Sequence, residues 1–110
     1  MFLTFYFQPV ADLAAAAQHY LSLGWDEAWR EGEHTIALQM PGVETQLMLD
    51  DEPGWGGAGP MYLVDDLLPW LAAHPELAAG EVQEIPGGRV AEITAPGHSY
   101  YVFSMDDVSS

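Results

Sequence analysis

The stretch Val10-Ala-Asp-Leu13 recurs 54 positions later as Val64-Asp-Asp-Leu67. In both copies an aspartate stands directly before a leucine, which is the arrangement expected where a helix begins. The offset is close to half of the 110-residue chain. The stretch therefore indicates an internal duplication, with a helix starting at the same place in each half.

The residues around the first copy predict a complete β-α-β-β-β unit. Residues 2–8 are aromatic and β-branched and end at Pro9, which is typical of a strand. The alanine-rich run 13–21 favours a helix that is capped by Asp12 and ends before Gly24. Three further strands are predicted at residues 25–30, 35–40 and 44–49.

The second half repeats this order after a glycine-rich segment. We expect a helix at 67–74, capped by Asp66, which Pro75 interrupts or kinks before Gly80 ends the unit. The predicted strands lie at residues 60–64, 82–85, 89–93 and 99–105. We therefore expect one domain over residues 1–110, with module one at 1–50, a hinge at 51–58 and module two at 59–107.

The composition limits the classes of partner. The chain has 17 acidic side chains, no lysine and two arginines, so its formal net charge is -15. Such a charge argues against nucleic acid and anionic membranes and attracts cations, whether small molecules, metals or basic proteins. There is no cysteine, no apolar run of about 20 residues and no basic flank at the amino terminus, so we expect a cytoplasmic protein without disulfides.

Taken together, these fragments resemble the vicinal oxygen chelate superfamily, which includes glyoxalase I, extradiol dioxygenases, fosfomycin-resistance enzymes and bleomycin-resistance proteins. The resemblance rests on the duplicated order and on short matches in both halves, which are Val10-Ala-Asp-Leu13, His19-Tyr20, Leu23-Gly24, Val64-Asp-Asp-Leu67 and Pro96-Gly-His98. It implies an α+β fold in which two βαβββ modules form a curved mixed sheet with a concave cleft. It also implies a homodimer.

The resemblance implies a metal site in the catalytic members, but its positions carry unsuitable residues here. The first-strand positions fall on Phe5 and Gly59, and the last-strand position falls on Tyr101, or on Val102 if the shorter turn shifts the register. Only Gln46 offers an oxygen. Because a divalent ion needs several converging oxygen or imidazole ligands, we expect no metal, no cofactor and no catalytic residue.

Apolar and mostly aromatic side chains occupy the positions at which the catalytic members carry metal ligands. Strand alternation puts Phe5 and Phe7 on the ligand side of the first strand. The expected ligand-binding set consists of Phe5, Phe7, Gln46, Trp55, Met61, Tyr101 and Phe103, with Gln46 as the hydrogen-bonding group and Trp55 as a lid. The same residues are also compatible with a filled core or a dimer interface.

The leading hypothesis is a metal-independent protein that binds a small aromatic or cationic molecule, as bleomycin-resistance proteins do, and so contributes to antibiotic resistance. The alternative is a metal-dependent lyase or dioxygenase with an atypical site built from Gln46, His34 and carboxylates. A third interpretation is a module that binds a basic protein.

Overall fold

The computed structural model describes residues 1–52 and 56–106, and the chain divides into two compact units. The N-terminal unit is Thr4–Pro60, and the C-terminal unit combines Met1–Leu3 with Met61–Ser110. Residues 53–55 of the expected hinge lie outside the described residues. No helix in the described part of the chain is long and apolar enough to cross a bilayer.

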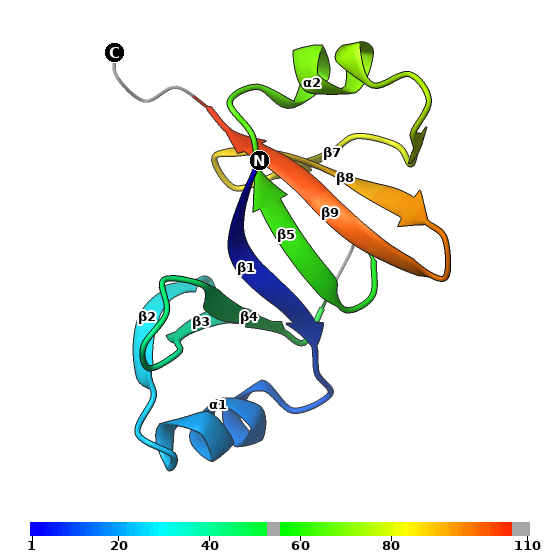
Figure 1. The fold of residues 1–110 in the computed structure, drawn as a ribbon. Coiled ribbons are helices and arrows are strands. Elements are labelled where there is room, and N and C mark those ends of the chain that lie inside the picture. Colours follow the sequence, from blue (N-terminus) through cyan, green and yellow to red (C-terminus); the bar gives the residue numbers. More distant parts are fainter. Residues whose placement is uncertain (53–55, 107–110) are drawn as a thin grey trace. The chain divides into compact units, whose positions relative to one another are not determined.

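The N-terminal unit follows the predicted β-α-β-β-β order (Figure 1). Its strands lie in the order β2-β3-β4-β1, with β1 parallel to β4 and the other pairs antiparallel. The strand predicted from residue 44 begins at Gln46, because residues 41–45 form the turn that joins β3 to β4. The elements are β1 (Phe2–Pro9), α1 (Leu13–Leu21), β2 (Asp26–Glu31), β3 (Thr35–Gln39) and β4 (Gln46–Asp50).

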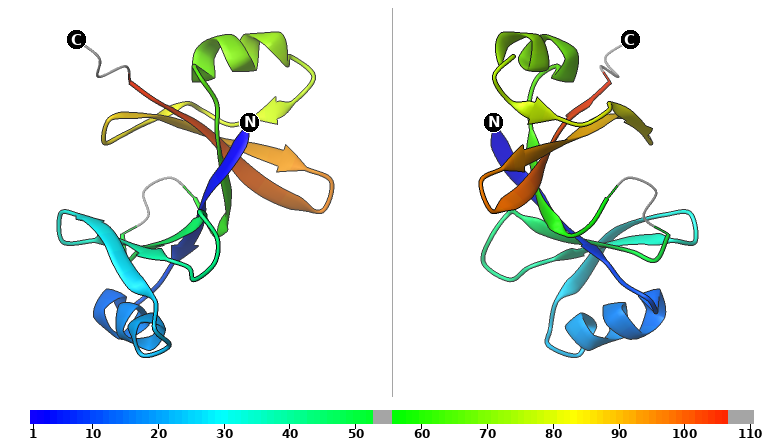
Figure 2. Two further views of the ribbon diagram at one scale, coloured as in Figure 1. Left: turned by 60° about the vertical axis from the view of Figure 1, so that its left-hand side comes forward. Right: turned by 90° about the vertical axis from the view of Figure 1, so that its right-hand side faces the viewer.

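Helix α1 begins and ends where the sequence predicts. The Asp12 side chain accepts a hydrogen bond from the backbone N–H of Ala15 at 3.0 Å, as an N-cap does. Gly24, just past the helix, has a φ of +94°, a conformation that favours glycine. The helix covers one face of the sheet (Figure 2) and packs on apolar side chains of β3 and β4. The buried cluster consists of Leu13, Ala17, Ile36, Leu38, Leu47 and Leu49.

The C-terminal unit repeats this arrangement with one strand that was not predicted. Strand β9 is parallel to β5 and antiparallel to β8, and β8 also pairs with β6 and β7. The unpredicted β6 exists because the chain turns back after Pro75 and Ala78 pairs with Thr94. The elements are β5 (Gly59–Leu63), α2 (Leu67–Ala73), β6 (Ala78–Ala79), β7 (Gln83–Ile85), β8 (Gly88–Ala95) and β9 (His98–Met105).

The anchoring at the start of α2 differs from the prediction. Asp66 occupies the N-cap position, but its side chain makes no capping hydrogen bond. The backbone N–H of Leu67 instead donates to the hydroxyl oxygen of Ser104 on β9, at 3.0 Å. Ser104 is buried, so this bond satisfies an amide inside the protein. The prediction that α2 begins after Asp66 is therefore confirmed, but the expected capping bond from its side chain is absent, and a side chain distant in sequence binds the first helical amide instead.

The two units share a structural repeat. The backbone N–H of Val10 donates to the carbonyl of Asp50 at 2.9 Å, and that of Val64 donates to Phe103 at 2.9 Å. In each unit this bond follows the parallel strand pair and leads into the helix. The core of the C-terminal unit likewise lies under its helix, with Val64, Leu67, Ala91, Ile93 and Val102 buried. The predicted α+β fold built from two such repeats is confirmed.

Candidate functional site

The face of the N-terminal sheet opposite α1 carries aromatic and amide side chains. On β4, Leu47 and Leu49 belong to the cluster under α1, so alternation places Gln46 on the other face. Gln46 is the register partner of Phe5 on β1 and of Gln39 on β3. Three adjacent strands therefore bring these residues together.

Gln46 is the centre of a chain of hydrogen bonds. Its side-chain oxygen accepts from the indole N–H of Trp29 at 3.0 Å, and its amide group donates to the Gln39 side-chain oxygen at 3.2 Å. The Gln39 amide in turn donates to the carbonyls of Val43 at 2.6 Å and Met40 at 3.2 Å. Each donor in this chain sets the orientation of the next amide, so Gln46 is held in one orientation.

Trp29 reaches this network through an irregularity in β2. The register between β2 and β3 shifts between Glu27 and Trp29, and Trp29 then pairs with Ala37. Such a bulge turns a side chain toward a new direction. The Trp29 ring meets Phe5 edge to face, with centroids 5.7 Å apart and an interplanar angle of 85°. This contact and the hydrogen bond to Gln46 hold the indole in place.

Trp29 and Gln39 contact the predicted site residues Phe5 and Gln46 but were not predicted as site residues themselves. The position of Gln39 could have been inferred, since Gln39 and Gln46 flank the Pro41-Gly42 turn and become cross-strand partners. Trp29 left no comparable signal, because simple alternation does not reveal a bulge. We call Phe5, Trp29, Gln39 and Gln46 the aromatic–amide cluster.

Three predicted site residues meet in the C-terminal unit. Tyr101 on β9 is the register partner of Met61 on β5, and Phe103 follows on the same side of β9. On its other side, Tyr101 pairs with Glu92 of β8. Burial, with a smaller contribution from the Glu92 charge, raises the pKa of Tyr101 to about 12. The phenol is therefore neutral at every physiological pH.

Burial separates the predicted site residues into two groups. Phe5 and Gln46 are partly accessible. Trp55 lies outside the described residues. The exposed fractions of the four buried members are at most 2%: Phe7, Met61, Tyr101 and Phe103. A ligand reaches these four only if the atoms that cover them move.

The donor set does not fit the divalent metal site of the catalytic superfamily members. Phe5 and Gly59 have no ligand atom in their side chains, and the Tyr101 phenol is held protonated. The Gln46 oxygen already accepts the Trp29 indole. Among the described residues, no three His, Cys, Asp or Glu side chains gather in a group suited to a metal ion.

The alternative site of Gln46 and His34 is not formed either. Gln46 pairs with Gln39 at one end of the β3–β4 ladder, whereas Thr35, next to His34, pairs with Asp50 at the other end. Four strand residues separate these ends by roughly 13 Å. Ligands of one ion lie about 2 Å from it, so the two side chains cannot share an ion.

Two solved structures resemble the chain over nearly its whole length. A hypothetical protein from Bacillus halodurans C-125 gives a TM-score of 0.76 at 15% sequence identity, covering 98% of this chain and 96% of that chain. A glyoxalase/bleomycin resistance protein/dioxygenase superfamily member from Vibrio splendidus 12B01 gives 0.62 at 13% identity, covering 92% and 96%. No family model and no curated protein matches the sequence. At these identities the likeness establishes the fold alone, which the chain shares with this superfamily member.

Proposed function

We propose that the protein binds a small aromatic or cationic molecule without a metal ion and that the aromatic–amide cluster makes the first contacts. The observation that carries this proposal is the hydrogen-bond chain from Trp29 through Gln46 to Gln39. It holds two neutral polar groups and two aromatic rings in place before a ligand arrives, which lowers the entropy lost on binding. None of these side chains is a nucleophile or a general base, so binding without turnover is the chemistry they suit best.

The charge of the chain favours a cationic ligand. Both arginines are already engaged, Arg30 with Glu27 at 2.7 Å and Arg89 with Glu84 at 3.4 Å. With a formal net charge of -15, the acidic side chains far outnumber these bases. The resulting field raises the local concentration of cations and speeds their encounter with the protein. Aromatic faces then add cation–π attraction.

The buried predicted residues have a supporting part in this proposal. Phe7 lies two residues beyond Phe5 on the same face of β1, and Tyr101 and Phe103 form the matching set in the C-terminal unit with Met61. We propose that Phe7 supports the ligand bound at the cluster, and that Met61, Tyr101 and Phe103 form an equivalent set of contacts within the C-terminal unit. Ligand-induced changes in the NMR signals of the Tyr101 ring would support this, whereas an unchanged ring would remove the set from the site.

The fold suggests a mode of ligand binding that can be tested. We propose sequestration of a basic aromatic compound, in the manner of bleomycin-resistance proteins, by a homodimer. Sedimentation equilibrium tests the homodimer separately, and a mass equal to one chain at all concentrations would rule it out.

The experiment is a thermal-shift screen against basic aromatic antibiotics, followed by titration of each hit. We expect at least one hit, and we expect Trp29→Phe to weaken it about threefold to tenfold because the Gln46 oxygen loses its donor. Trp25→Phe is the matched control, since Trp25 packs on the α1 side of the sheet against Tyr20. A screen without a hit, or equal weakening by both variants, would contradict the proposal.

A further inference from the structure

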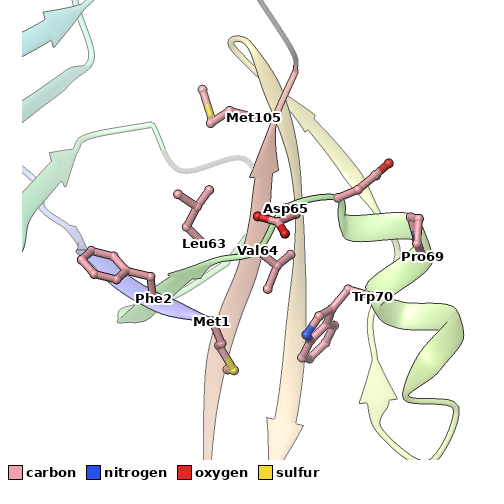
Figure 3. A pocket seen from close by; sticks show the side chains of 9 residues that line it. Met1, Phe2, Leu63, Val64, Asp65, Pro69, Trp70 and Met105 are labelled. Atoms are coloured by element: carbon pink, nitrogen blue, oxygen red, sulfur yellow. The ribbon is translucent and has the colours of Figure 1, made fainter.

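A pocket lies wholly within the C-terminal unit, and it contains no residue of the aromatic–amide cluster. It has a volume of about 670 Å³, which is within the range of small-molecule sites. It opens where the start of β1, the end of β5 and the beginning of α2 meet (Figure 3). The residues that line it are Met1, Phe2, Leu63, Val64, Asp65, Asp66, Pro69, Trp70 and Met105.

The pocket combines apolar walls with unneutralised negative charge. In the close-up, Phe2 and Leu63 lie on one side of the Asp65 carboxylate and Trp70 lies on the other (Figure 3). No lysine, arginine or histidine side chain is among the lining residues. The carboxylates of Asp65 and Asp66 make no hydrogen bond or ion pair with another described residue.

No basic side chain of the described residues forms an ion pair with these carboxylates. Arg30 belongs to the N-terminal unit and is paired with Glu27, and Arg89 is paired with Glu84. His74 stacks on the Trp70 ring at 4.3 Å, but its Nδ1 is engaged with the Trp70 carbonyl at 2.8 Å. Met1 also lines the pocket, but its α-amino group forms no ion pair with Asp65 or Asp66. Both carboxylates are therefore unpaired among the described residues and can receive an added cation.

The apolar lining indicates what kind of cation fits. Phe2 and Met105 are 56% and 49% exposed, so both offer apolar surface to a ligand in the pocket. Burial of apolar area at Phe2 and Trp70 would add to the attraction of the carboxylates, and the ring faces attract cations as well. A small inorganic cation gains only the electrostatic part, so it fits less well than an organic ammonium.

We propose that this pocket is a second binding site, specific for an amphipathic organic cation that places an apolar group against Phe2 and Trp70 and an ammonium group beside Asp65. The site is independent of the aromatic–amide cluster, and its occupant is a small molecule rather than a second copy of the chain.

The test is an NMR titration of the full chain with each of three probes of similar size. The probes are 2-phenylethylammonium, neutral 2-phenylethanol and anionic phenylacetate. We expect the ammonium to bind most tightly and phenylacetate least, with signal changes centred on Leu63, Trp70 and Met105. Asp65→Asn should weaken the ammonium about threefold and leave 2-phenylethanol unchanged. Asp26→Asn, which makes the same charge change on β2 of the other unit, should alter the affinity far less.

A second pair of variants tests the apolar wall. Phe2→Ser should weaken the ammonium and the alcohol alike, whereas Leu23→Ser, which removes an equally exposed side chain from the other unit, should weaken neither. Trp25→Phe, on the α1 side of the N-terminal sheet, should leave the affinities reported by Leu63, Trp70 and Met105 unchanged. Because these three reporters belong to the C-terminal unit, failure here is distinguishable from failure of the proposed function.

Three results would overturn the proposal. The first is equal affinity for all three probes, and the second is a response centred on Trp29 and Gln46 in place of the pocket. The third is self-association that Phe2→Ser abolishes while the ammonium causes no signal change, which would make the pocket an interface between copies.

Discussion

At the scale of single residues, His34 shows how one side chain connects the start of β3 to the segment after β4. Its Nδ1 lies 2.7 Å from an Asp51 carboxylate oxygen, and its Nε2 lies 3.4 Å from a Glu52 oxygen. The Asp51 backbone N–H also donates to the His34 carbonyl at 3.1 Å. The hydrogen bond to Asp51 raises the pKa of His34, and the charges of Glu52, Asp51 and Glu33 act in the same direction.

The sign of the resulting pH dependence follows from this raised pKa. When the pKa of a histidine is higher in the folded state than in the unfolded state, its protonation stabilises the fold. This stabilisation is fully present below the unfolded-state pKa of about 6.5. This contribution is lost as the pH rises through the folded-state pKa of His34. The window therefore begins near pH 6.5 and extends upward.

We predict that Asp51→Asn lowers the pKa of His34 toward its ordinary value, because the variant removes both the charge and the strongest acceptor. An NMR titration of the His34 imidazole protons measures this shift. Asp26→Asn removes a charge from β2 and serves as the control, which should leave the pKa of His34 nearly unchanged. A pKa that is insensitive to Asp51→Asn would show that the contact does not persist in solution.

At the scale of elements, the two helices begin at equivalent sequences but are anchored differently. Asp12 caps α1 through its own side chain, whereas the first amide of α2 depends on Ser104 of β9. The start of α1 is thus secured locally and the start of α2 by the sheet beneath it. Sequence similarity between the two copies predicts that both helices exist, but it does not predict how each one is held.

We predict unequal effects of replacing the two aspartates on the free energy of unfolding in urea. Asp12→Ala should lower the free energy of unfolding by about 1 kcal/mol, because it removes a cap that accepts a hydrogen bond. Asp66→Ala should change it by only a few tenths of a kcal/mol, since no such bond exists. Ser104→Ala should cost about 1–3 kcal/mol, because it leaves the buried Leu67 amide without its partner. A large effect of Asp66→Ala would contradict the assignment.

At the scale of the whole molecule, the acidic charge opposes folding through repulsion among like charges. The formal net charge of -15 is spread over 110 residues with only two bases to offset it. Salt screens such repulsion, since the Debye length falls from about 30 Å at 0.01 M to about 3 Å at 1 M. The chain tolerates this charge because its apolar residues, 49% of the total, supply a core in each unit.

We predict that the melting temperature at pH 7 rises by a few degrees, or roughly 1 kcal/mol of stability, when KCl is increased from 0.01 M to 0.5 M. Differential scanning calorimetry measures the rise. The same increase in KCl near the isoelectric point of about 4.1 should change the melting temperature much less, because little net charge remains to be screened. A melting temperature that falls with salt at pH 7 would mean that attractive ion pairs dominate.

Local sequence patterns were sufficient for the α+β class, for both helices and for most strands. Alternation, alanine content and the glycine and proline positions act over a few residues, so they are visible without any tertiary contact. The sequence put Gln46 and Phe5 in one expected site, but their register, in which Phe5 pairs with Gln46, was set by the sheet.

The features that local patterns missed all depend on contacts between distant segments. The bulge that turns Trp29 toward Gln46, the pairing of Ala78 with β8 and the bond from Leu67 to Ser104 each join residues that are 16 or more positions apart in the chain. Burial also depends on distant contacts. The sequence predicts Tyr101 as a site residue, but only 1% of it is exposed in the fold. A chain's short-range preferences select its elements, whereas accessibility and partner choice are set only when those elements pack.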